Sequence, residues 1–229
     1  EGAIFTDQQG LVPYAAPEVM TAADLVATRD AFVEASKNAI EAGFDGVELH
    51  AANGYLLEQF LHPHTNRRED GYGGTSDARN RFAIEVVRAA VAAIGADRVA
   101  IRLSPHSTLG DLPLADAAEV EAQYTALARA LRGILYLHVA GNTHPSFATT
   151  TRAMREAFGG PFISNGGLDR MRAQAVIDAG DADLVSFGRP FIANPDFVTR
   201  MQRDLPLADM KPELLYAPGP EGYIDYAAA

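Results

Sequence analysis

Three side chains that can donate hydrogen bonds follow an apolar run in the segment DGVELHAANGYLLEQF, residues 45–60. His50 ends the run, Asn53 lies three positions later, and Tyr55 two positions after that. If the chain turns there, the neutral donors His50 and Asn53 can converge on a carbonyl oxygen, as in an oxyanion hole. Tyr55 can supply a proton from its O–H group. A lone histidine is usually structural, but this spacing predicts a site that polarises a substrate and protonates it.

Arg102 is a further candidate, in the next apolar run, RVAIRLSP. A buried guanidinium group requires an anionic or strongly accepting partner. Glu48, on the polar side of the preceding run, could be that partner, because buried charges are usually paired. A bound ligand could also fill this role, and the two interpretations remain open at this point.

Two later segments predict a phosphate-binding site. FISNGGLDRMRAQAV places Gly166 and Gly167 between a strand and a helix with Asp169 near its cap, and LVSFGRPFIANPDF ends a strand in Gly188 and Arg189. Glycine lets a phosphate approach the backbone, a helix N-terminus supplies N–H donors, and arginine adds charge in a planar fork. The alternative is that the glycines form only tight turns and Arg189 is a surface charge. The G-x-G-x-x-G fingerprint of dinucleotide binding follows none of the expected strands.

Helices and strands in strict alternation are expected to position these residues. A helix is predicted over residues 21–43, with Thr21 and Asp24 at the spacing of a capping box and Gly43 at its end. Five strands follow in alternation with helices, a pattern typical of parallel strands joined by helical crossovers. The strands are expected to end near His50, Ser104, Ala140, Asn165 and Gly188.

The two ends of the chain are less regular. Residues 1–20 show no clear period, and the last helix is expected to have Asn194 as its N-cap and Pro195 at its first helical position. The N-terminal EGAIFTDQQG lacks both a methionine and the basic region of a signal peptide, so we expect it to begin within a longer fold. Because no linker or second zone of composition interrupts the pattern, residues 1–229 are predicted to form a single domain.

The predicted strands carry polar side chains on one side only. In VELH, Val47 and Leu49 face one way while Glu48 and His50 face the other, and VAIRLS and LVSFG alternate in the same way. A strand in an open doubly wound sheet is apolar on both faces, whereas a barrel strand turns one face to the helices and one to the interior. The pattern therefore favours a (β/α)8 TIM barrel. Such a barrel has eight strands, so either the sheet is open or something else supplies the remainder.

Composition narrows the function classes. The chain contains no cysteine, which excludes disulfides, thiolate metal ligands and a cysteine nucleophile, and fits a cytoplasmic protein. No metal site is expected. The formal net charge of −11 argues against a nucleic-acid surface and against charge-driven docking on a membrane. No apolar run approaches the ~20 residues of a membrane span.

The segment AGFDGVELHAANGYLLEQFLHPHTNRREDGYGG, followed by ARNRF, resembles the Old Yellow Enzyme family of flavin-dependent ene-reductases very closely. So do VAIRLSP, ISNGG, SFGRPFIANPDFV and EGYIDY, and the resemblance runs in order along nearly the whole chain. It implies a (β/α)8 barrel with noncovalent FMN at the carboxyl ends of its strands. It also implies that NADPH or NADH reduces the flavin, whose N5 then passes a hydride to the β-carbon of an activated alkene: an enone, enal or nitroalkene.

The same resemblance implies roles for single residues. His50 and Asn53 match the pair that hydrogen-bonds the carbonyl or nitro oxygen of the substrate, and Tyr55 matches the acid that protonates the α-carbon. Arg102 matches the arginine beside the pyrimidine edge of the flavin, and Tyr216 matches an aromatic residue near the substrate cavity. The phosphate cradle is matched by Gly166, Gly167, Gly188 and Arg189, and Asn165 of the ISNGG motif is grouped with these cofactor-binding residues.

The chain departs from the family pattern at its N-terminal end. The family's first three strands, which carry a threonine that tunes the flavin and a glutamine that contacts it, would precede this chain. The five predicted strands would then be strands four to eight. A complementary N-terminal fragment, expected as a separate chain, would complete the barrel; the alternatives are a permuted segment and a loss of these strands.

Two other functions remain open from the sequence. One is a non-catalytic half-barrel that binds flavin or phosphate, in which His50, Asn53 and Tyr55 are relics. The other is a non-redox enzyme on a phosphate-binding barrel, such as a sugar-phosphate isomerase or lyase, which the phosphate end alone would permit.

Overall fold

The centre of the fold is a five-stranded parallel sheet with the strand order β3-β4-β5-β6-β7, as the alternation of helices and strands predicts. The structure, a computed structural model, describes residues 3–6, 9–13, 15–110 and 112–228. The strands are β3 (Val47–Ala51), β4 (Val99–Leu103), β5 (Leu137–Ala140), β6 (Phe162–Asn165) and β7 (Leu184–Ser186). Each ends within two residues of the position expected from the sequence.

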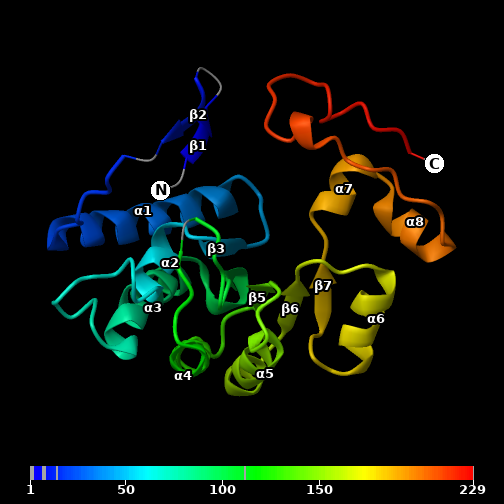
Figure 1. The fold of residues 1–229 in the computed structure, drawn as a ribbon. Helices are drawn as coiled ribbons and strands as arrows, with labels where there is room; N and C mark the ends of the chain where they lie inside the picture. Colours follow the sequence, from blue (N-terminus) through cyan, green and yellow to red (C-terminus); the bar gives the residue numbers. More distant parts are fainter. Residues whose placement is uncertain (1–2, 7–8, 14, 111, 229) are drawn as a thin grey trace.

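Helices precede β3 and connect the successive strands, and Figure 1 shows them around the outside of the sheet. The longer helices are α1 (Ala22–Glu41), α3 (Ser76–Ile94), α4 (Ala117–Ala130), α5 (Phe147–Phe158) and α6 (Arg170–Asp178). The short ones are α2 (Leu56–Leu61), α7 (Arg189–Ala193) and α8 (Phe197–Arg203), with 3-10 turns η1 (Ala96–Arg98) and η2 (Pro212–Leu214). The predicted capping box is confirmed at the start of α1, where the backbone N–H groups of Thr21 and Asp24 each donate to the other's side chain.

The hydrophobic core lies between the sheet and these helices. Along β3, Leu49 and Ala51 are buried, whereas Glu48 is exposed and His50 is half-buried, which confirms the predicted alternation. The largest fully buried side chains include Ile101, Leu103, Leu137 and Phe162 from strands and Phe82, Val86, Leu127 and Met154 from helices. Apolar packing therefore occupies the outer face of the sheet and leaves the inner face to polar groups.

The sheet does not close on itself, since β3 and β7 form its two edges. Leu184 of β7 is in register with inward-facing residues of the neighbouring strands, and its side chain is 55% exposed. Proteins normally cover such unpaired edges and exposed apolar side chains. The observed sheet thus corresponds to the five βα units of an incomplete barrel.

An N-terminal hairpin was missed by the sequence analysis, which found no period in residues 1–20. Strands β1 (Ala3–Thr6) and β2 (Gly10–Pro13) pair in antiparallel fashion, with Thr6 opposite Gly10. Leu11 of β2 is 74% exposed. Because β2 buries so little, it carries no apolar–polar alternation that a sequence could reveal.

The prediction that Asn194 caps the last helix was wrong. Helix α8 begins at Phe197 and has Asp196 as its N-cap. Asn194 is fully buried after α7, where its amide donates to the carbonyls of Pro190 and Ala208 and accepts from the Ala208 N–H. Its side chain is committed to the segment that follows α8 and is not available for a cap.

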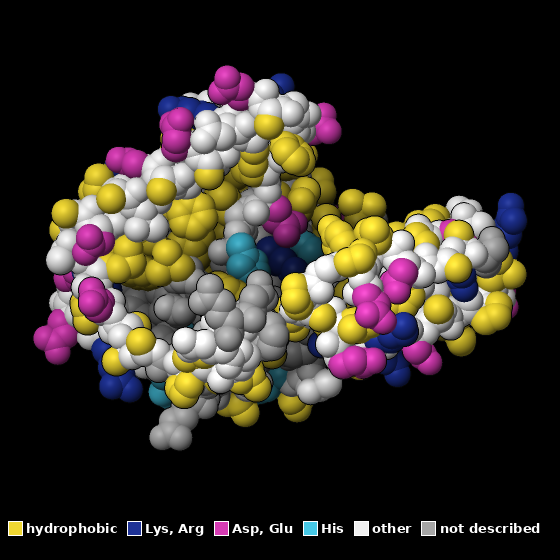
Figure 2. Space-filling view, turned by 90° about the horizontal axis from the view of Figure 1, so that it is seen from above, with side chains coloured by type: hydrophobic (Ala, Val, Ile, Leu, Met, Phe, Trp, Pro, Cys, Tyr) yellow, Lys and Arg dark blue, Asp and Glu magenta, His cyan; other side chains and the backbone are white. Residues whose placement is uncertain are grey.

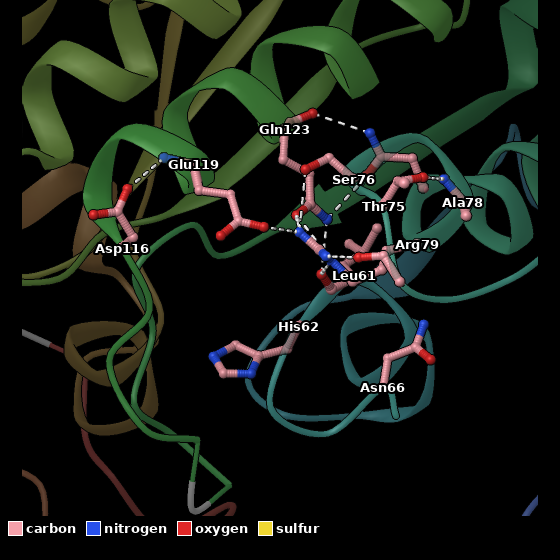
Figure 3. Close-up of polar contacts among 12 residues, drawn as sticks. Leu61, His62, Asn66, Thr75, Ser76, Ala78, Arg79, Asp116, Glu119 and Gln123 are labelled. Atoms are coloured by element: carbon pink, nitrogen blue, oxygen red, sulfur yellow. Dashed lines mark hydrogen bonds and ion pairs between the residues drawn. The ribbon is translucent and has the colours of Figure 1, made fainter. Parts of the chain in front are cut away.

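A buried arginine joins α3 to α4 and to the end of α2 (Figure 3). Arg79 is 3% exposed and donates to Gln123 at 2.7 Å, to Glu119 at 2.5 Å and to the carbonyl oxygen of Leu61 at 3.2 Å. Gln123 also donates to the Leu61 carbonyl, at 2.7 Å. These contacts fix the carboxyl end of α2, the helix that follows the site on β3.

Replacing Arg79 by alanine is expected to lower the free energy of unfolding by about 3 kcal/mol. The substitution removes a buried donor and leaves its acceptors on Glu119 and Gln123 without the guanidinium group. Arg88→Ala is the matched control: Arg88 is exposed on the same helix, and its loss should cost less than ~0.5 kcal/mol. Urea denaturation measures both variants. Equal midpoints for the two would contradict the role assigned to Arg79.

Candidate active site

Polar side chains gather on the inner face of the sheet, toward the carboxyl ends of the strands. Figure 2 shows this region from above as a hollow with histidine, basic and acidic side chains in its floor. His50 of β3 is in register with Arg102 of β4, and Arg102 with His138 of β5. Parallel strands therefore place residues that are 52 and 36 positions apart in one row.

His50 is held as a neutral imidazole in this row. Burial and the positive charge of Arg102 lower its pKa, while the charge of Glu48 opposes them. At neutral pH the ring can therefore donate from one nitrogen without carrying a charge. Among the described residues, none is hydrogen-bonded to the His50 ring, so this donor is available to a ligand.

Asn53 and Tyr55 lie in the turn that follows β3. Asn53 adopts a left-handed backbone conformation with φ 59°, and Tyr55 is the N-cap of α2. Tyr55 is 62% exposed, and the centroid of its ring lies 5.0 Å from that of the His50 ring. The structure thus brings the three residues of the H-x-x-N-x-Y string to one turn at the end of β3.

Glu48 does not form the ion pair with Arg102 that the sequence left open. Its carboxylate is hydrogen-bonded to His138 Nδ1 at 2.9 Å, and His138 Nε2 contacts Ser186 Oγ at 2.8 Å. Burial opposes ionisation of Glu48, but His138, Tyr136 and Arg102 together lower its pKa. His138 was not among the sequence candidates, although its polar ring in the apolar run ILYLHVAG is a signal that the period-two pattern could have used.

Arg102 instead contacts a neutral amide. Its Nη2 donates to Asn165 Oδ1 at 3.0 Å, and Asn165 Nδ2 donates to the backbone carbonyl of Ser186 at 2.9 Å. Arg102 Nε is buried and has no hydrogen-bond partner among the described residues. The guanidinium therefore has one N–H donor that is not used. Buried donors are nearly always hydrogen-bonded in proteins, so this one is available to a ligand.

The glycines of the predicted phosphate end fall into two kinds. Gly166 has φ 117°, and a Cβ there would lie 2.6 Å from Gly141 Cα, so the packing of two loops already requires glycine. Gly167 and Gly188 have open space where a Cβ would be. Arg189 is exposed, and within the described part of the chain its guanidinium has no ion pair. Open space and a free cation fit an anion, whereas Gly166 needs no ligand to explain it.

Two other predicted residues at this end of the molecule have different surroundings. The N-terminus of α6 is occupied by the side chain of Asp169, which accepts from the backbone N–H of Arg172 at 2.8 Å, so a carboxylate already caps this helix. Tyr216 follows η2 and is 76% exposed. Among the described residues, no ring contact joins it to His50 or Tyr55.

Glu58 is a buried carboxyl group that the sequence analysis did not single out. It lies in α2 and is 1% exposed. Burial raises its pKa to about 7, although hydrogen bonds from Ser104, the Gly54 N–H and Tyr124 act in the opposite direction. A glutamate in the first turn of a helix gave no signal, because helices commonly carry glutamate.

Replacing Glu58 by glutamine is expected to flatten the pH dependence of stability. The folded chain holds the Glu58 proton more tightly than the unfolded chain, so this group favours folding below about pH 4.5 and loses that contribution as the pH rises to about 7. Between pH 5 and pH 8 the loss is on the order of 2–3 kcal/mol. Urea denaturation at both pH values should show the unsubstituted chain losing stability relative to the variant. Parallel changes in the two proteins would contradict this.

The fold and the site together define part of a parallel α/β barrel, with a polar site at the carboxyl ends of its strands. The sequence profile of the NADH:flavin oxidoreductase / NADH oxidase family matches residues 3–208. The chain belongs to this family, in agreement with the resemblance to Old Yellow Enzymes. In the described part of the chain, no helix combines the length and the apolar character needed to cross a membrane.

Individual relatives agree with this assignment. The chain is 42% identical to putative 12-oxophytodienoate reductase 5 of Oryza sativa subsp. japonica, over 97% of this chain and 61% of the relative. It is 39% identical to a chanoclavine-I aldehyde reductase of Penicillium roqueforti, over 92% and 60%. The structure of morphinone reductase matches with a TM-score of 0.91 and 37% identity, over 99% of this chain and 62% of that protein. A complex of morphinone reductase with tetrahydroNAD matches with a TM-score of 0.89 and 38% identity, over 99% and 62%. The chain therefore spans about 60% of the length of these relatives.

Proposed function

We propose that this chain forms the catalytic part of an FMN-dependent ene-reductase, in which NADPH or NADH is the reductant and an enone, enal or nitroalkene is the substrate. The observation that carries the proposal is the placement of His50, Asn53 and Tyr55 on one turn, next to Arg102. Membership of a flavin oxidoreductase family supports it and disfavours a non-redox phosphate-binding enzyme.

His50 and Asn53 are proposed to bind the carbonyl or nitro oxygen of the substrate. Both are neutral donors, and neither side chain is hydrogen-bonded to another described residue. Donation to the oxygen withdraws electron density from the conjugated double bond. The β-carbon becomes more electrophilic as a result, because the donors stabilise the negative charge that develops on the oxygen.

Tyr55 is proposed to donate a proton to the α-carbon. Its ring lies beside His50, with 5.0 Å between the centroids, and therefore close to the atom that the clamp would hold. Tyr55 is 62% exposed, so it lies at the surface of this chain. The tyrosine can thus recover its proton from water after each turnover.

The residues on the inner face fit FMN. Arg102 offers a buried, unused N–H, and Gly167 and Gly188 offer open space at the proposed phosphate end. We propose that FMN is held by Arg102, Asn165, Gly166, Gly167, Gly188 and Arg189, with Tyr216 from the C-terminal segment close to the substrate cavity. When bound, FMN supplies the hydride.

We further propose that a complementary segment completes the barrel by pairing with β3 and β7. The unpaired edges and the exposed Leu184 support this, as does the greater length of the relatives. We also propose that this segment is a separate chain and that the assembly is cytoplasmic. The non-catalytic half-barrel remains an alternative that substitution of His50 and Tyr55 can exclude.

The proposal is tested by purifying this chain alone and together with an N-terminal fragment of a relative that supplies three strands. We expect the complemented sample to show flavin absorbance and to oxidise NADPH in the presence of an enone. The chain alone should bind little flavin, because one side of the barrel is open. Full flavin loading and turnover by the chain alone would contradict the need for a partner, and a colourless complemented sample would contradict the flavin-dependent function.

A further inference from the structure

A buried hydrogen-bond network lies directly beneath the turn that carries Asn53. Glu58 Oε2 accepts from the Gly54 N–H at 2.6 Å, and Glu58 Oε1 accepts from Ser104 Oγ at 2.5 Å. Tyr124 Oη donates to the same Oε1 at 3.3 Å. Ser104 Oγ in turn accepts from the Asn53 N–H at 2.8 Å. The backbone N–H groups of two successive turn residues are therefore bound by side chains from α2 and from the end of β4.

The turn itself has an uncommon backbone conformation. Asn53 and Gly54 have φ values of 59° and 79°, so two consecutive residues are left-handed. Few non-glycine residues adopt this conformation without support from their surroundings. A Cβ at Gly54 would lie 2.6 Å from the carbonyl oxygen of Leu109, so the turn also packs closely on the loop that follows β4. The direction of the Asn53 side chain depends on this turn.

The side chain and the backbone of Asn53 differ in their hydrogen bonding, and this difference indicates a function for the network. The side-chain amide of Asn53 is not hydrogen-bonded to any described residue, whereas its backbone N–H is bound to Ser104. Glu58 is 1% exposed and Ser104 is 2% exposed, so neither side chain can reach a substrate in the hollow. Their effect on a substrate must pass through the turn.

We propose that Glu58 and Ser104 are positioning residues for the substrate clamp: they hold the left-handed turn that aims the Asn53 amide at the substrate oxygen. This inference rests on the proposed function, since it assigns Asn53 to the clamp. It adds two residues that make no contact with the substrate, and it explains why a carboxyl group is buried in α2.

The first test measures the turn without reference to activity. Hydrogen–deuterium exchange of the complemented assembly is compared for the unsubstituted protein, Glu58→Gln and Ser104→Ala. Exchange of the Asn53 amide should become about tenfold faster or more in Ser104→Ala, which removes the oxygen that accepts from it. Exchange of the Gly54 amide should become faster by a similar factor in Glu58→Gln, because the carboxylate uses both oxygens as acceptors and glutamine keeps only one. The amides of β5 should be unchanged. Unaltered exchange at the turn would overturn the proposal.

The second test is a double-mutant cycle on kcat/KM for an enone. Glu58→Gln should lower it by about tenfold in the unsubstituted background and by less than ~2-fold when Asn53 is already alanine, because residues that act through one another are not additive. Glu156→Gln, on the exposed face of α5, is the matched control and should have no effect in either background. Equal losses in both backgrounds would show a general structural effect and overturn the proposal.

Failure of the proposed function can be distinguished from failure of this inference. If the unsubstituted assembly reduces no enone, the ene-reductase proposal and the clamp role fall together. The exchange comparison then still decides whether Glu58 and Ser104 hold the turn.

Discussion

Replacing His50 by alanine is expected to lower kcat/KM for an enone by about 100-fold or more, since one of two donors to the developing oxyanion is removed. Burial and Arg102 lower the pKa of His50, so the ring that is lost is a neutral donor already oriented by β3. Asn53→Ala should have a similar effect. The double variant should lose less than the product of the two single losses, because the two donors act on the same oxygen.

The control for this prediction is His64→Ala. His64 is exposed in the loop after α2 and lies outside the proposed site. The His64→Ala variant should retain the turnover and the flavin content of the unsubstituted assembly. Steady-state NADPH oxidation, followed over enone concentrations that reach saturation, measures the four variants beside the unsubstituted assembly. Undiminished kcat/KM for His50→Ala would contradict the clamp.

The Tyr55→Phe variant is expected to lose about 100-fold or more in the rate of enone reduction, the range for removal of a general acid. Phenylalanine keeps the ring that lies 5.0 Å from His50 and removes only the O–H group. Reduction of the flavin by NADPH does not require this proton, so that half of the reaction should keep its rate. Stopped-flow absorbance separates the two halves.

Tyr223→Phe provides the matched control for the tyrosine. Tyr223 is 81% exposed in the C-terminal segment, and loss of its hydroxyl should leave both half-reactions unchanged. If Tyr55→Phe and His50→Ala both turned over enones at the original rate, the trio would have no catalytic role. The non-catalytic half-barrel would then be the better interpretation.

Local patterns explain why much of the fold and site could be predicted. The period-two alternation in VELH assigned Leu49 to the core and Glu48 and His50 to the inner face, and the structure agrees. The string from His50 to Tyr55 is only six residues long, so its convergence needs no knowledge of distant contacts. Capping at Thr21 was predictable for the same reason.

The network partners could not be predicted because they come from distant parts of the sequence. Glu58 contacts Ser104 and Tyr124, which are 46 and 66 positions away. The choice between His138 and Arg102 as the partner of Glu48 likewise depends on the register of β3, β4 and β5. Sequence patterns predict which side chains of a strand face the interior. They do not predict which side chain of a neighbouring strand will be the hydrogen-bond partner.

The most direct test of the ene-reductase proposal is the position of deuterium in the product. The complemented assembly is supplied with an enone and with NADPH that carries deuterium at both C4 positions, and the product is analysed by NMR and mass spectrometry. We predict a saturated ketone with deuterium at the β-carbon. An allylic alcohol, or a saturated ketone without deuterium from the nicotinamide, would contradict hydride delivery to an alkene held by His50 and Asn53.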